Sequence, residues 1–85
     1  MKTIEIIVKD PIGLHARPAG LLVKEARKYA STVTVHKGER AVEASRLMAL
    51  MGLCIKTGEA VTVTVEGADE ELAARELTAF FAENL

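Results

Sequence analysis

Residues 13–19, with the sequence Gly-Leu-His-Ala-Arg-Pro-Ala, constrain the fold more than any other part of the chain. Proline fixes the backbone angle φ and has no N–H group, so it is tolerated in the first turn of a helix but not in its interior. Apolar residues recur after Pro18 at steps of three and four, which is the spacing of a buried helix face. We therefore predict a helix from about Ala16 to Lys28, with His15 at its N-cap.

The predicted start of this helix has the chemistry of an anion-binding site. The first turn of a helix presents free backbone N–H groups and the positive end of the helix dipole. The amides of Ala16 and Arg17, together with the forked guanidinium of Arg17, suit a phosphate group. The imidazole of His15 supplies a nucleophilic nitrogen. These residues favour phosphoryl transfer to His15, although an ordinary capping histidine would leave the same pattern.

The composition argues against several other classes of protein. The chain has 85 residues, 49% hydrophobic and 27% charged, which is typical of one small globular domain spanning residues 1–85. A formal net charge of -1, with one tyrosine and two phenylalanines, argues against nucleic-acid binding. The single cysteine, Cys54, cannot form an internal disulfide, and no apolar run is long enough to span a membrane. We expect a cytoplasmic protein with no cofactor and no metal site.

Alternating residues and turn signals divide the rest of the chain into further elements. β-Branched residues at every second position predict strands. Asp69 is expected to cap the last helix, and Ser45 is expected to cap a short helix that ends near Leu53. The expected strands are Thr3–Val8, Thr32–His36, Arg40–Glu43 and Ala60–Glu66. The order strand, helix, strand, strand, helix, strand, helix predicts an α+β fold in which helices cover one face of an antiparallel sheet.

The motif at residues 13–19 resembles the active-site signature of the HPr family, the histidine-containing phosphocarriers of the phosphoenolpyruvate-dependent sugar phosphotransferase system. The resemblance covers essentially the whole chain, including the Lys37-Gly38 hairpin, the run at residues 47–51 and the entry to the last helix at residues 66–70. It implies an open-faced β-sandwich, a four-stranded antiparallel sheet with three helices on one face.

The resemblance also implies a function. His15 would be phosphorylated on Nδ1, and Arg17 would stabilise the phosphate. Enzyme I would donate the phosphoryl group from phosphoenolpyruvate, and sugar-specific enzyme IIA domains would accept it. Such a chain is a stoichiometric carrier, not an enzyme, and we expect it to be a monomer with no direct insertion into membranes.

By matching position, the resemblance implies a partner-binding surface on the first two helices. Four large apolar residues in residues 47–51 cannot all face one buried stripe, so we expect only Leu50 in the core. Basic side chains at the edge would steer acidic partners, although a solvated helix face explains them equally well. Gly20 departs from the alanine or threonine of many relatives and would offer only backbone. The expected contact residues are Gly20, Leu21, Lys24, Arg27, Leu47, Met48 and Met51.

Ser45 and Arg46 mark a second departure from the family pattern. Many relatives carry a serine immediately before the hydrophobic pair that opens the second helix, and in some bacteria a kinase phosphorylates it. Here Arg46 occupies that position and Ser45 precedes it, which puts serine-kinase regulation in doubt. Of the residues left over, His36 is expected at the surface of a hairpin, and Cys54 is expected to be buried or half-buried.

Three other functions are compatible with parts of this pattern. A carrier of a regulatory branch of the same system, for nitrogen or carbon responses, would keep the same histidine. A binding module that carries no phosphate would be expected to lack the nucleophile, and His15 is present. An enzyme that uses His15 for acid–base catalysis on a phosphoester would need a second acid or base and a pocket.

Overall fold

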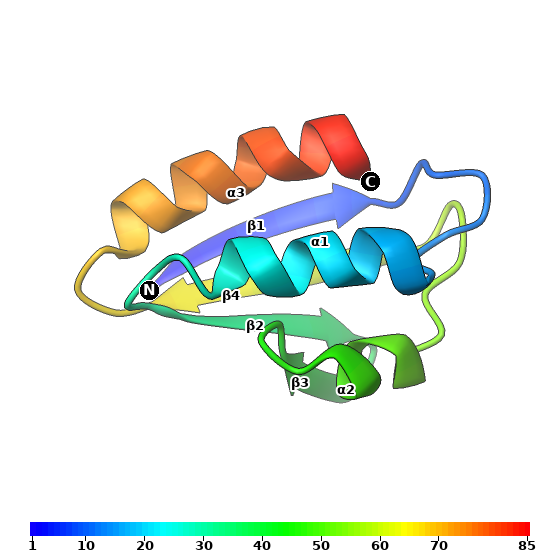
Figure 1. The fold of residues 1–85 in the computed structure, drawn as a ribbon, viewed down its shortest axis with the longest axis horizontal. Helices are drawn as coiled ribbons and strands as arrows, with labels where there is room; N and C mark the ends of the chain where they lie inside the picture. The colour runs from blue at the N-terminus through cyan, green and yellow to red at the C-terminus, as the bar shows by residue number, and fades with distance from the viewer.

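The computed structural model describes all of residues 1–85. In chain order the elements are β1 (Lys2–Ile7), α1 (Ala16–Ala26), β2 (Thr32–Lys37), β3 (Arg40–Glu43), α2 (Leu47–Gly52), β4 (Ala60–Glu66) and α3 (Glu70–Asn84). The four strands form one sheet in the order β1-β4-β2-β3, and all neighbouring pairs are antiparallel. The three helices lie on one side of this sheet (Figure 1). The expected α+β open-faced β-sandwich is therefore confirmed.

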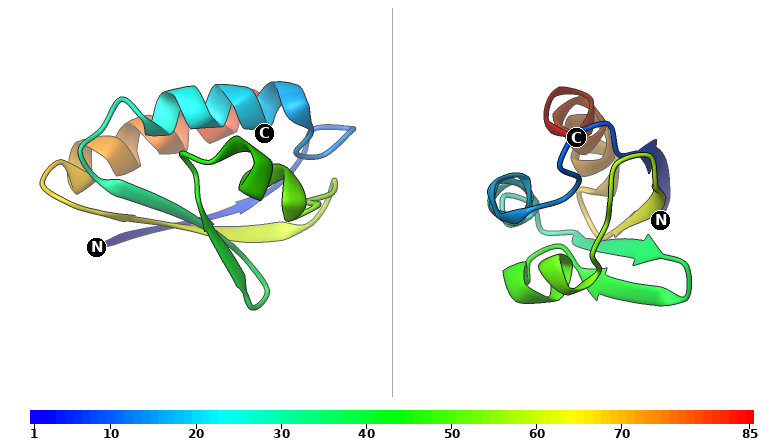
Figure 2. Two further views of the ribbon diagram at one scale, coloured as in Figure 1. Left: turned by 60° about the horizontal axis from the view of Figure 1, so that its bottom comes forward. Right: turned by 90° about the vertical axis from the view of Figure 1, so that its right-hand side faces the viewer.

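The last strand in the chain, β4, lies inside the sheet between β1 and β2. Its valines, Val61, Val63 and Val65, are buried against the helices, while Thr62 and Thr64 lie on the opposite face. An antiparallel sheet covered on one face produces this alternation of buried apolar and exposed polar residues. The separation of a helical layer from an uncovered sheet face is visible when the molecule is viewed from its end (Figure 2).

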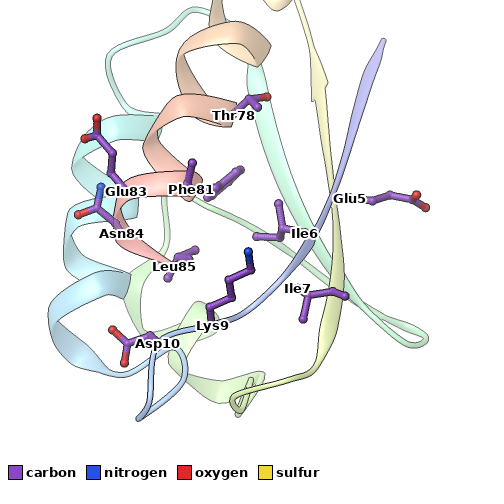
Figure 3. Close-up of a pocket in the computed structure, with 11 residues that line it drawn as sticks. Glu5, Ile6, Ile7, Lys9, Asp10, Thr78, Phe81, Glu83, Asn84 and Leu85 are labelled. Atoms are coloured by element: carbon purple, nitrogen blue, oxygen red, sulfur yellow. The ribbon is translucent and has the colours of Figure 1, made fainter.

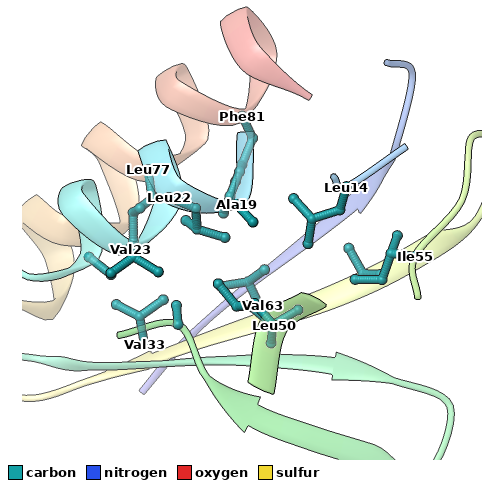
Figure 4. Packing of buried hydrophobic residues seen from close by; sticks show 14 of the residues in the cluster. Leu14, Ala19, Leu22, Val23, Val33, Leu50, Ile55, Val63, Leu77 and Phe81 are labelled. Atoms are coloured by element: carbon teal, nitrogen blue, oxygen red, sulfur yellow. The ribbon is translucent and has the colours of Figure 1, made fainter. Parts of the chain in front are cut away.

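The core fills the space between the helices and the sheet. Helix α1 contributes Ala19 and Leu22, α2 contributes Leu50, and α3 contributes Leu77, each of them at most 1% exposed. These side chains meet the valines of β2 and β4 (Figure 4). Leu50 is thus a core residue, as expected. Because α1 spans the sheet with its buried face fixed by these contacts, its N-terminus lies at one end of the molecule (Figure 1).

The loop before α1 is anchored to the rest of the structure by backbone hydrogen bonds. Leu14, itself buried, donates its N–H to the carbonyl of Ile55 at 3.0 Å. Within the loop, Gly13 donates to the carbonyl of Asp10 at 2.9 Å. The N–H of Asp10 in turn donates to the backbone oxygen of Leu85 at 3.0 Å. The segment that leads to His15 is therefore held between the loop after α2 and the end of α3.

Gly13 occupies a site in this loop that no other residue fits without strain. Its φ angle is +81°, in the left-handed region that side chains disfavour. A Cβ atom built at this position would come within 2.6 Å of the carbonyl oxygen of Ile55 and 2.9 Å of the Cα of Lys56. The close approach of these two backbones sets the position from which α1 starts.

One expected helix cap and one expected helix end are wrong. The N-cap of α2 is Arg46, in an extended conformation, and not Ser45. The carbonyl of Ser45 accepts a hydrogen bond from Nη2 of Arg27 at 2.8 Å, so this residue joins α1 to the start of α2. Helix α1 also ends at Ala26, two residues before the predicted Lys28, with Arg27 as its C-cap.

Asp69 is the N-cap residue of α3, but its side chain does not cap the helix. Its carboxylate instead accepts hydrogen bonds from the N–H groups of Ala30 and Ser31, both at 2.9 Å, and from the Ser31 hydroxyl at 2.5 Å. The hydroxyl of Ser31 is the largest cause that lowers the pKa of Asp69 below its ordinary value, followed by the Ala30 amide. Asp69 therefore joins the turn after α1 to the turn before α3.

The two remaining residues of interest lie outside the helical layer. Cys54 is exposed, which contradicts the expectation of a buried or half-buried cysteine. Its neighbours Leu53 and Ile55 both point into the core, so the residue between them faces outward in a left-handed conformation. His36 is partly buried on the uncovered face of the sheet, with Nε2 3.1 Å from the hydroxyl oxygen of Thr64. No helix of the structure has the length and apolar character needed to cross a bilayer.

Replacing Gly13 by alanine is expected to lower the free energy of unfolding by at least about 1 kcal/mol. Alanine disfavours the left-handed backbone conformation, and its Cβ would collide with the carbonyl oxygen of Ile55. Gly20 is the matched control, since it lies inside α1 and a Cβ there meets nothing within 4 Å. Gly20→Ala should raise the free energy of unfolding by roughly 0.5–1 kcal/mol. Urea denaturation of both variants checks the pair, and an unchanged Gly13→Ala midpoint would contradict the packing described for this loop.

Replacing Asp69 by alanine is expected to lower the melting temperature at neutral pH, because three hydrogen bonds lose their acceptor. The pKa of Asp69 is lower in the folded protein, so the unfolded chain binds more protons near that pKa, and stability rises with pH. The contribution of Asp69 is thus present at neutral pH and lost as the pH falls through its lowered pKa. The difference in melting temperature between wild type and Asp69→Ala should therefore become smaller in acid. Glu39→Ala, at an exposed position, is the control and should show no such difference.

Candidate functional site

His15 lies at the N-cap of α1, as predicted, with φ and ψ of -99° and -172°. Its side chain makes no capping hydrogen bond and is 34% exposed. Its carbonyl accepts the hydrogen bond from Ala19 at 3.0 Å, and Pro18 is buried in the first turn. The imidazole is thus held at the helix start by its backbone and remains accessible from solvent.

The first turn of α1 leaves donors free beside this imidazole. The amides of Ala16 and Arg17 precede the N–H of Ala19, which makes the hydrogen bond to the N-cap carbonyl. In an α-helix such amides have no partner within the helix and carry the positive end of the dipole. Arg17 is exposed, and its guanidinium makes no hydrogen bond or ion pair with the protein. These residues present cationic and N–H donors to an anion at His15.

A shallow pocket of about 450 Å³ opens next to His15. Arg17 and Leu21 of α1 line it on one side, and Glu83 and Asn84 from the last turn of α3 line it on another. The loop contributes Asp10, whose Oδ1 lies 3.7 Å from Nε2 of His15. The same carboxylate oxygen accepts a hydrogen bond from the Ile12 amide at 2.9 Å. Both donor and acceptor groups therefore surround the imidazole.

Asp10, Glu83 and Asn84 are the site residues that the sequence did not indicate. A second hollow, of about 540 Å³, runs between β1 and the end of α3 and shares these three residues with the first (Figure 3). The Asp-Pro turn that contains Asp10 was visible in the sequence, but its distance to the imidazole was not. The approach of α3 to the helix start depends on contacts far apart in the chain, for which no local signal exists.

The expected partner-binding residues fall on one surface. Helices α1 and α2 lie next to each other on the same side of the sheet (Figure 2), and Arg27 joins them through the Ser45 carbonyl. Four of the residues are large, apolar and exposed, and we call them the α1–α2 surface: Leu21, Leu47, Met48 and Met51. Met48 is the most open of them, with 79% of its surface exposed. Leu21 also lines the pocket of His15, so this surface is continuous with the histidine.

The remaining residues of the prediction lie around or within this surface. Lys24, Arg27 and Arg46 are exposed, and they give the α1–α2 surface a basic border. Arg27 is fixed by its hydrogen bond to Ser45, whereas Ser45 itself is half-buried. Gly20 is half-buried, and the space above it is open. The structure thus brings the predicted contact residues together with His15.

Comparisons with known proteins agree with this arrangement. A family model described as "PTS HPr component phosphorylation site" matches residues 2–83. Phosphocarrier protein HPr of Lysinibacillus sphaericus is 41% identical over 83 residues, which cover 98% of this chain and 94% of that protein. The HPr-like protein Crh of Bacillus subtilis (strain 168) is 38% identical over 81 residues, which cover 95% of each chain. The crystal structure of HPr-C-His from Thermoanaerobacter tengcongensis superposes with a TM-score of 0.93 and 38% identity, over 99% of this chain and 94% of that one.

These matches extend over nearly the whole chain and are not confined to the motif at residues 13–19. The structural similarity likewise covers nearly the whole chain, and so includes the sheet and the helices that place His15 at an exposed helix start. The chain belongs to the HPr family, the phosphocarrier proteins of the phosphotransferase system.

Proposed function

We propose that this chain carries a phosphoryl group on Nδ1 of His15, accepts it from phosphorylated Enzyme I and passes it to enzyme IIA domains. One observation carries the proposal. The accessible imidazole of His15 stands at the free N-terminus of α1, beside the unpaired guanidinium of Arg17. A nucleophilic nitrogen, a forked cation and helix amides together provide what phosphoryl transfer requires.

The proposed transfer uses this geometry in two steps. The lone pair of Nδ1 attacks the phosphorus atom, a new P–N bond forms, and the bond between phosphorus and its donor group breaks. Arg17 and the amides of Ala16 and Arg17 bind the phosphoryl oxygens as charge spreads over them. The second transfer reverses these steps toward the acceptor. The chain acts as a stoichiometric carrier and uses no cofactor, because positioning and charge supply the needed stabilisation.

The α1–α2 surface is the site at which donor and acceptor dock. Its exposed leucine and methionine side chains suit an apolar centre on the partner, and methionine adapts to partners of different shape. Lys24, Arg27 and Arg46 around it favour a partner with an acidic rim. Gly20 adds only backbone contact. The protein works in this scheme as a single-domain monomer in the cytoplasm.

A regulatory branch of the same system is the second candidate. The HPr-like protein Crh of Bacillus subtilis is among the relatives, and Crh is also known as a catabolite repression containing protein. A carrier of the regulatory branch would be expected to keep the histidine motif too, so the identity of the acceptors decides between the two functions. Arg46 stands where many relatives carry a serine that a kinase phosphorylates in some bacteria, and Ser45 is half-buried, which argues against control by a serine kinase. Transfer to a panel of enzyme IIA domains from sugar and regulatory branches distinguishes the two.

Incubation with Enzyme I and phosphoenolpyruvate is expected to yield a phosphoprotein that is labile in acid and stable in base. His15→Ala should accept no label, because the acceptor nitrogen is gone. Arg17→Ala should slow transfer by roughly tenfold to a hundredfold while the melting temperature stays unchanged. Arg17→Lys is the matched variant, since it keeps the charge and loses the forked geometry. Label on His15→Ala would refute the assignment of the acceptor.

Met48→Ser is expected to raise the KM of Enzyme I for this protein about fivefold or more, because Met48 is exposed on the α1–α2 surface and would be buried in the complex. Leu72→Ser is the matched control, since Leu72 is also exposed but lies on α3. Circular dichroism should show both variants as stable as wild type. Equal KM values for the two variants would place the docking site elsewhere.

A further inference from the structure

The carboxylate of Asp10 is fixed in front of one particular nitrogen of His15. Its Oδ1 lies 3.7 Å from Nε2, and the two side chains are 26% and 34% exposed. The carboxylate is held by the Ile12 amide, and the backbone of Asp10 is held by Gly13 and Leu85. Asp10 is the one acidic residue with an atom within ion-pair distance of the imidazole. The contact is therefore held in place by the hydrogen bonds of the loop, and it involves Nε2, not Nδ1.

A neutral imidazole carries one proton, and the nitrogen that holds it cannot act as the nucleophile. A carboxylate next to one ring nitrogen favours the proton on that nitrogen, as it does for histidines that bind metals or act as general bases. A negative charge near Nε2 thus leaves the lone pair on Nδ1. We propose that Asp10 is a positioning residue that keeps the proton on Nε2 and so selects Nδ1 as the acceptor nitrogen. The role of Asp10 in selecting the acceptor nitrogen rests on the proposed function, whereas the position of the proton on the imidazole does not depend on that function.

The proton balance of the transfer supports this role. When Nδ1 attacks phosphorus and the donor bond breaks, the proton stays on Nε2 and the ring becomes positively charged. The carboxylate of Asp10 then faces the cationic side of the ring, while Arg17 and the helix amides face the phosphoryl group. When the P–N bond breaks again, the electron pair returns to Nδ1 and Nε2 keeps its proton. No proton has to enter or leave the ring in either step.

The other charged groups around the site do not share this position. Arg17 and Glu83 line the pocket of His15, but neither makes an ion pair with the imidazole. Asp10→Asn keeps an oxygen that can accept the hydrogen bond from Ile12 and removes only the charge. Glu83→Gln removes a charge of the same sign from the same pocket without touching the contact to Nε2. The two variants form a matched pair.

The test measures the imidazole ¹⁵N chemical shifts of His15 in the unphosphorylated full-length chain at alkaline pH, where the ring is neutral. Wild type and Glu83→Gln should show the proton predominantly on Nε2. In Asp10→Asn the ratio of the Nε2–H to the Nδ1–H form should fall roughly two- to fivefold, the range for a partly exposed charge pair. A ratio unchanged in Asp10→Asn, or lowered equally in both variants, would overturn the proposal. Amide spectra that match wild type away from residues 9–15 confirm that the variants fold.

The rate of phosphorylation by Enzyme I gives the functional readout. It should fall roughly two- to fivefold in Asp10→Asn. It should stay at the wild-type value in Glu39→Gln, which removes an exposed acid from the turn between β2 and β3, away from the pocket of His15. A wild-type rate in Asp10→Asn despite the altered proton ratio would overturn the role in selecting the acceptor. Failure of the wild-type chain to accept phosphate would instead refute the proposed function, and the ¹⁵N ratios would still decide where Asp10 holds the proton.

Discussion

The contact between the backbone of Gly13 and the backbone of Ile55 and Lys56 is the constraint on which the site depends. A left-handed residue without a side chain lets two loops from distant parts of the chain approach closely. The hydrogen bond from Leu14 to Ile55 then fixes the next residue, and His15 follows at the N-cap. The position of the imidazole is thus set by packing that precedes the helix, and not by any bond of its own side chain.

The helix α1 connects this loop to the core and to the exposed surface at once. Ala19 and Leu22 are buried against the sheet, whereas Leu21 and Lys24, on the other side of the helix, are exposed. Its N-terminal amides lie beside His15, and its C-terminal end is linked to α2 through the hydrogen bond from Arg27 to Ser45. One amphipathic helix therefore joins the core, the proposed phosphorylation site and the proposed docking surface through different faces.

Local features of the sequence predicted most of the fold. Pro18 marked the start of α1, and the alternating valines of β4 marked a strand covered on one face, because both signals depend only on neighbouring residues. Asp69 shows where such reasoning fails. Its local context suggested a helix cap, but its carboxylate bonds to Ser31, and no pattern near Asp69 indicates a partner that distant in the chain. The exposure of Cys54 was missed because its neighbours, not its own apolar character, decide which way it points.

For the candidate site, too, residues close together in the sequence could be predicted, whereas those brought in by tertiary packing could not. His15, Arg17 and the helix amides could be predicted because they lie in one continuous segment. Asp10, Glu83 and Asn84 could not be assigned to the site, since their approach depends on how the loop and α3 pack against each other. The order of strands, with β4 between β1 and β2, was likewise a property of the tertiary structure.

The small size of the molecule has a consequence for how a carrier of this shape exchanges partners. Its whole accessible surface is 5086 Å², while a stable protein interface covers about 800 Å² on each side. For a chain that carries phosphate on His15, every productive interface must enclose this histidine, so donor and acceptor compete for the same area. The carrier has to leave one partner before it meets the next, and flux then depends on fast dissociation. A modest apolar area with a charged border serves such short encounters better than a large dry interface would.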